Sequence, residues 1–218
     1  MLSVLNQPGS SISKLAWHPE GILAAGGGGK VDVWSNTRIE TPLTKIEACA
    51  DDKNVTERLK RIRAKIVKRS LKLRLPVEVS EVEDFEVRYG VVLPEGFRRF
   101  ITEIGDGGEG PPAYGLMSLQ EIISRYNPPA KIHIPFSLTN SSLWEGEEPK
   151  RTELSQVASN GGHLYLGTDG CTMEWMLIVT GAERGHIWNI CDVGAGPVKP
   201  RRDFLSWYEH WMDRGGVR

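Results

Sequence analysis

Apolar side chains recur at helical spacing shortly after residue 77. Val82, Phe85 and Tyr89 fall on one helical face, and Ser80 with Glu83 forms a capping-box pair at the start of that stretch. A glycine follows Tyr89, and a glycine in the left-handed conformation commonly ends a helix. The pattern predicts a helix from about residue 80 to residue 89.

A second helix is predicted to begin at Pro94, because proline is favoured in the first turn. Phe97, Phe100 and Ile101 share its apolar face, and Gly105 is placed to end it in a left-handed conformation. Further on, Ser118 repeats the capping-box pattern for a brief helix that ends near residue 126. These signals place three helices in the first half of the domain.

Strand signals dominate the second half. Residues 163–166, 172–179 and 186–190 are apolar runs joined by short glycine-containing connections, which are typical of an antiparallel meander. Residues 114–117 and 131–138 also predict strands.

A closing helix is predicted over residues 203–213, where aromatic residues recur at helical spacing. Helices, then a meander, then a last helix predict an α+β fold in which an antiparallel β-meander sheet is flanked by helices.

The first fifty residues differ from this pattern. Residues 12–26 and 31–34 predict three short strands, and a Pro-x-Gly turn at Pro19 separates the first two. The segment is similar to part of one WD-repeat blade, which makes residues 1–50 a blade-like β segment. A propeller closes only with several such blades, and the sequence holds no second copy, so we expect no propeller function from it.

Composition places the chain among globular proteins. Of 218 residues, 39% are hydrophobic and 25% are charged, which suffices for a buried core. The three cysteines form no Cys-x-x-Cys pair, which favours a reducing compartment. Because no apolar run reaches membrane-spanning length and the first residues lack a signal-peptide pattern, we expect a cytoplasmic protein with no membrane partner.

Charge divides the chain near Pro76. Residues 1–77 have a net charge of +7, and residues 78–218 have a net charge of −8. We therefore expect the acidic domain to span residues 77–218 and to fold without the basic segment that precedes it.

The basic segment, residues 51–76, predicts an amphipathic helix. Leu59, Ile62 and Ile66 form a narrow apolar stripe between cationic flanks. We favour packing of this stripe on the neighbouring domain over binding to nucleic acid, a lipid surface or an acidic protein. Nucleic acid is disfavoured because no aromatic side chains are interleaved to stack on bases.

Several short motifs follow one another between residues 78 and 213. In chain order they are Tyr89-Gly90, Leu93-Pro94-Glu95-Gly96-Phe97-Arg98-Arg99-Phe100, the glycine-rich turn of 106–110, Gly115-Leu116-Met117, Leu166-Gly167-Thr168-Asp169-Gly170-Cys171 and Gly185-His186-Ile187-Trp188. The ordered set resembles the SUKH superfamily, a group named for a yeast cell-wall synthesis regulator and for bacterial immunity proteins. Thr172 stands where this resemblance leads us to expect a glycine.

The resemblance implies a non-enzymatic immunity protein that binds and neutralises a polymorphic toxin domain in the bacterial cytoplasm, often one encoded nearby. An acidic domain suits such a partner, because clustered opposite charge steers association with a basic nuclease. The alternative is a protein-binding regulatory scaffold with a SUKH-like domain and no toxin partner. Which toxin is bound, and whether the chain self-associates, stays open.

The expected binding surface combines loop and helix-end acids with tryptophan. Trp144 lies among acids in a polar loop, so it is either an exposed anchor for a cationic cleft or folded back on its own domain. Trp175 lies in an apolar strand, and its side depends on register. The candidate protein-binding residues are Glu103, Asp106, Glu109, Trp144, Glu145, Glu147, Glu148, Asp169 and Trp175.

Catalytic and metal signals are weak. Cys171 with His186 is the best candidate nucleophile pair, with Asp169 and Glu174 nearby, but no family-type signature surrounds the cysteine. The five histidines never occur at i, i+4 with an acidic third ligand. We therefore expect no enzyme activity, no cofactor and no metal.

Overall fold

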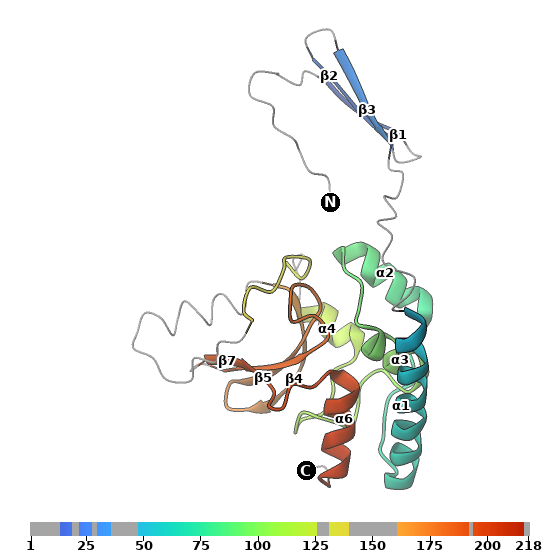
Figure 1. The fold of residues 1–218 in the computed structure, drawn as a ribbon, viewed down its shortest axis with the longest axis vertical. Helices are drawn as coiled ribbons and strands as arrows, with labels where there is room; N and C mark the ends of the chain where they lie inside the picture. Colours follow the sequence, from blue (N-terminus) through green and yellow to red (C-terminus); the bar gives the residue numbers. More distant parts are fainter. Residues whose placement is uncertain are drawn as a thin grey trace. The chain divides into compact units, whose positions relative to one another are not determined.

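The computed structural model describes residues 14–18, 22–27, 30–35, 48–125, 131–139, 161–191 and 194–215. The chain divides into two compact units, Met1–Asp51 and Asp52–Arg218. Figure 1 traces both units along the sequence.

The first unit holds a three-stranded antiparallel sheet in the order β1-β2-β3. Its strands are β1 Lys14–His18, β2 Ile22–Gly27 and β3 Lys30–Ser35. In the register, Ala24 of β2 lies between Ala16 of β1 and Val33 of β3. The three strands predicted from turn chemistry are confirmed.

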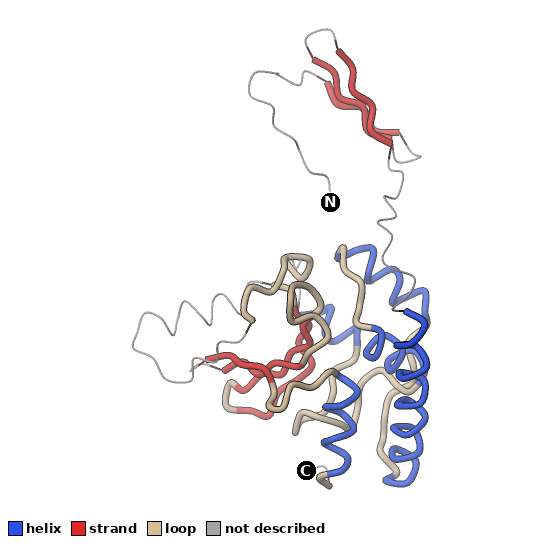
Figure 2. The backbone as a smooth tube through the Cα atoms, in the orientation of Figure 1, coloured by secondary structure: helices blue, strands red, loops and turns tan. Residues whose placement is uncertain are grey.

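The second unit is an α+β structure, as predicted. Its helices are α1 Ala48–Arg69, α2 Val79–Tyr89, α3 Glu95–Glu103, α4 Leu119–Arg125 and α6 Phe204–Asp213. Its strands are β4 His163–Gly170, β5 Met173–Ile178, β6 Ile187–Cys191 and β7 Gly194–Pro197, paired antiparallel in that order as a meander. Figure 2 shows α1, α3 and α6 gathered on one side of this sheet.

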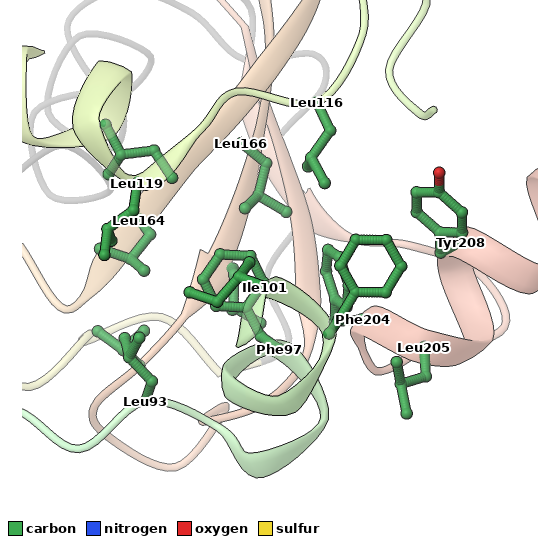
Figure 3. Close-up of a cluster of buried hydrophobic side chains, with 14 of the residues drawn as sticks. Leu93, Phe97, Ile101, Leu116, Leu119, Leu164, Leu166, Phe204, Leu205 and Tyr208 are labelled. Atoms are coloured by element: carbon green, nitrogen blue, oxygen red, sulfur yellow. The ribbon is translucent and has the colours of Figure 1, made fainter. Parts of the chain in front are cut away.

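The main core lies between α3, α6 and the sheet. Phe97 of α3 meets Phe204 of α6 edge to face, with ring centroids 4.9 Å apart. Leu164 and Leu166 of β4 reach the same cluster, as Figure 3 shows. A smaller cluster around Trp188 lies apart from this core.

The basic helix α1 belongs to this core. Val55, Leu59, Ile62 and Ile66 are buried in the same cluster as α3 and α6. This confirms that the apolar stripe packs on the domain, and it argues against the expectation that residues 77–218 fold without the helix. After α1 the chain runs on in extended form, and Leu73 pairs with Gly108.

Helix ends follow the sequence signals in some places and not in others. Gly90 is left-handed and ends α2, as predicted. The prediction that Ser80 and Glu83 form a capping box is wrong, because α2 begins at Val79 and its N-cap is Glu78. Gly105 is not the left-handed stop of α3. A Cβ there would lie 2.8 Å from the Leu73 Cβ, so the glycine serves close chain approach instead.

Two predicted strands are not formed. Residues 114–117 contribute only an isolated bridge, Gly108 to Leu116, and residues 131–138 contribute only a bridge from Phe136 to Gly181. Strand β7 was not predicted, because Gly-Ala-Gly-Pro has little intrinsic strand preference and depends on pairing with β6.

Ile62 tests the contribution of α1 to the core. Its side chain is 0% exposed, so Ile62→Ala leaves a cavity, and we expect a loss of about 2–5 kcal/mol in the free energy of unfolding. Val67 on the same helix is 72% exposed, and Val67→Ala should change stability by less than about 0.5 kcal/mol. Urea unfolding followed by circular dichroism measures both. Equal losses would mean that α1 is not part of the core.

The β4–β5 turn tests the resemblance at Thr172. Cys171 and Thr172 both have positive φ, at 49° and 64°. A left-handed residue other than glycine costs about 1–2 kcal/mol, and glycine costs about 0.5–1 kcal/mol in chain entropy. We expect Thr172→Gly to stabilise the protein by up to about 1 kcal/mol in thermal unfolding, whereas Thr172→Ala, which keeps the Cβ, should give no gain. Destabilisation by glycine would show that the turn holds no strain.

Candidate protein-binding groove

A groove of about 920 Å³ opens between the end of α1, the loop before α4 and the end of α6. Its volume is within the range of ligand pockets, but its walls come from three separate segments of the chain. The lining residues are Arg69, Leu71, Lys72, Arg74, Gly108, Glu109, Gly110, Ala113, Tyr114, Gly115, Leu116, Met117, Glu121, Trp211 and Gly215.

Close backbone approach builds the floor of the groove. The segment after α1 pairs with residue 108, and residue 108 pairs in turn with Leu116. A Cβ on Gly108 would lie 2.6 Å from the Lys72 carbonyl oxygen, so only glycine fits there. The buried Tyr208 hydroxyl of α6 donates a hydrogen bond to the Glu109 carbonyl at 2.8 Å, which ties the loop to the core. Burial raises the pKa of Tyr208, so this donor keeps its proton.

Tyr114 is displayed at the edge of the groove. Its side chain is 77% exposed, while its backbone N–H donates to the Thr168 carbonyl of β4. The neighbouring Ala113 N–H donates to the Asp169 carboxylate at 2.6 Å. The ring lies beside Gly170, where an added Cβ would come within 3.1 Å of it. A hydrogen-bonded backbone therefore holds an exposed aromatic ring.

The acids of the groove already have donors. Glu121 accepts two hydrogen bonds from Arg74, one of them at 2.7 Å, and caps α4 together with Ser118 as predicted. The hydrogen bond from Arg74 is the main cause that lowers the pKa of Glu121 to about 2. The Glu109 carboxylate accepts the Lys72 backbone N–H at 2.8 Å. By contrast, no described residue forms an ion pair with the side chain of Arg69 or Lys72.

Other cations of α1 are paired inside the unit. Arg58 binds the Asp203 carboxylate, and Lys65 binds Glu209 and Asp213, all on or next to α6. Burial would raise the pKa of Glu209, but the hydrogen bonds from Arg61 and Lys65 outweigh it and lower the pKa. Residues 52–218 contain 23 Lys or Arg and 23 Asp or Glu, so the unit as a whole has a net charge of zero.

The helix-end acids predicted for the binding surface form internal contacts. Glu103 pairs with Arg99 at 2.6 Å on α3. Asp106 accepts the Leu119 N–H at the start of α4, and burial raises its pKa. Of the predicted acids that the structure describes, Glu109 is the one that lines the groove.

The last two described candidates contact each other. Trp175 donates its indole N–H to the Asp169 carboxylate at 2.7 Å, and its ring packs at a tilt against the Trp207 ring, with the centroids 5.4 Å apart. Both residues therefore support the β4–β5 hairpin next to Tyr114. The remaining candidates, Trp144, Glu145, Glu147 and Glu148, lie outside the described residues.

Arg69, Lys72, Tyr114 and Trp211 line the groove and were not among the predicted site residues. No sequence signal singled out Tyr114, because the pattern assigned residues 114–117 to a strand. The sequence could not distinguish Arg69 and Lys72 from the other cations of the basic segment, because whether a cation finds an ion-pair partner depends on where α6 ends.

The candidate nucleophile pair is not formed. Cys171 lies in the turn before β5 and His186 lies beyond its other end, and a strand of six residues separates them by about 20 Å. His186 instead lies 3.7 Å from the buried carboxylate of Glu183, which also binds Arg201 and accepts the Trp188 indole N–H. Within the described ranges, no cluster of three or more His, Cys, Asp or Glu is placed to hold a metal.

Glu121 gives a pH-dependent test of the groove wall. Because its pKa is about 2 in the folded chain and about 4.5 when unperturbed, its contribution to stability is full above pH 4.5 and is lost as the pH falls toward 2. We expect Glu121→Gln to be less stable than the wild type near neutral pH, with the difference shrinking in acid. Urea unfolding at several pH values measures it. A constant difference would mean that Arg74 does not bind the carboxylate.

Among the helices in the described part of the chain, none is long and apolar enough to cross a membrane. Comparisons with protein-family models, curated proteins and solved structures find no match to this chain. The likeness to the SUKH superfamily therefore rests on the ordered residues of the sequence.

Proposed function

We propose that the chain is a non-enzymatic, SUKH-type immunity protein that binds and neutralises a toxin domain in the bacterial cytoplasm. The observation that supports this best is the groove, where an exposed ring at Tyr114 stands on a backbone held by Asp169 and Tyr208. Tyrosine is among the residue types enriched at the positions that dominate the energy of protein interfaces, and a side chain already held in place costs less to order on binding. A toxin domain is proposed as the partner because the ordered motifs of the sequence resemble those of the SUKH superfamily.

The chemistry of the groove favours recognition over catalysis. Its two acids each accept hydrogen bonds from the protein, and the depressed pKa of Glu121 makes it a poor general base near neutral pH. Among the described lining residues there is no serine, threonine, cysteine or histidine to serve as a nucleophile or a proton carrier.

Growth rescue tests the proposal. The full chain is co-expressed with the toxin catalytic domain encoded by the adjacent gene, and we expect growth to be restored and a 1:1 complex to be isolated. Tyr114→Ala should weaken the complex by at least about tenfold in calorimetry, as expected for an interface anchor. Val87→Ala changes a side chain that is 83% exposed on α2 and serves as the matched control.

Two results would contradict the proposal. The first is the absence of both protection and binding for every toxin domain encoded beside the gene. The second is stable 1:1 binding to a host protein without any protection, which would favour the regulatory scaffold instead.

A further inference from the structure

Arg69 and Lys72, which form no ion pair with a described residue, lie where the described ion pairs between α1 and α6 stop. Lys65 is paired with Asp213, the last residue of α6. One turn further along α1, Arg69 has passed the end of that helix, and Lys72 follows in the extended segment. Both line the groove and are exposed.

The acids nearby cancel only part of these charges. Glu121 is paired with Arg74, whereas Glu109 accepts a neutral backbone N–H and keeps its negative charge. Among the described lining residues the three cations exceed the two acids by one, so the groove combines a net positive charge with the Tyr114 ring and the half-buried Trp211 ring. Such a surface is complementary to a carboxylate-bearing segment with an apolar or aromatic side chain.

We propose that the groove docks an acidic protein segment, with carboxylates of the partner at Arg69 and Lys72 and an apolar side chain of the partner between Tyr114 and Trp211. The inference rests on the proposed function in taking the ligand to be a protein. It reverses the sign expected from the sequence, because the predicted acids in the described residues form internal contacts and the open surface is cationic.

A protein segment fits better than a nucleic acid. Nucleic-acid binding draws its affinity from many cations along the phosphate backbone. Here the unit has no net charge, and Arg58, Arg61 and Lys65 are held by carboxylates of its own chain. Two cations that have no ion-pair partner in the described part of the chain, beside two rings, suit a short acidic motif.

A peptide titration tests the groove without any toxin. The probe is a synthetic peptide in which glutamates flank one phenylalanine and one leucine, and the matched probe has lysines in place of the glutamates. Isotope-labelled full-length protein is titrated with each peptide, and amide shifts are recorded. We expect the acidic peptide alone to shift residues of the groove, with the response centred on Tyr114 and weakened by added salt.

Charge reversal supplies the matched variants. Arg69→Glu combined with Lys72→Glu should weaken binding of the acidic peptide by at least about fivefold. Lys131→Glu combined with Lys199→Glu makes the same change in net charge at two exposed lysines that do not line the groove, and it should change binding by less than about twofold. Urea unfolding checks that both variants remain folded.

Several outcomes would overturn the inference. They are no shift with the acidic peptide, shifts centred away from the groove, equal weakening by both double variants, or tighter binding of a thymidine oligonucleotide at the same residues. Growth rescue separates this failure from that of the proposed function. If Arg69→Glu with Lys72→Glu still protects against the toxin, the groove inference fails and the immunity function stands. If the wild type does not protect, the function fails and the peptide titration alone judges the groove.

Discussion

Burial of the apolar stripe of α1 beside α6 is the interaction on which the rest of the second unit depends. Each buried side chain of the stripe, Leu59 or Ile62 for example, contributes about 1.5–3 kcal/mol relative to exposure. The partly exposed ion pairs that run alongside, such as Lys65 with Glu209, contribute about 0–1 kcal/mol each. The stripe therefore stabilises the packing, and the charges chiefly set which side chains of the two helices face each other.

The packing of α1 beside α6 also determines which charged side chains remain available to a partner. Charge counted along the sequence divides the chain into a basic part and an acidic part, yet folding places the two against each other and leaves a neutral unit. The helix lengths decide which charges remain: Lys65 pairs with Asp213, the last residue of α6, and Arg69 and Lys72, which come later in the chain, form no ion pair with a described residue. The position of the cationic groove thus follows from a mismatch between two helices.

The sequence predicted those elements that have their own local signal. The aromatic face of α6, the cap at Ser118 and the meander were predicted because each depends on residues close together in the chain. The alternating residues 131–138 were assigned to a strand, but their backbone groups do not form a strand ladder. The Phe136 N–H donates to the Thr180 carbonyl, and the Thr180 hydroxyl donates to the Ile134 carbonyl. The groove was missed because it needs residues 73 and 108 to meet, which no local pattern indicates.

The loop that displays Tyr114 is built from parts that the core already holds in place. Leu116, two residues later, is buried, and Gly110 lies so close to the Tyr208 ring that a Cβ would come within 2.7 Å of it. A ring presented on such a backbone loses little conformational freedom when a partner covers it, so less of the binding energy is offset by ordering. The same contacts that close the core over α6 therefore preorganise the surface, and changes that loosen the core should weaken binding before they unfold the chain.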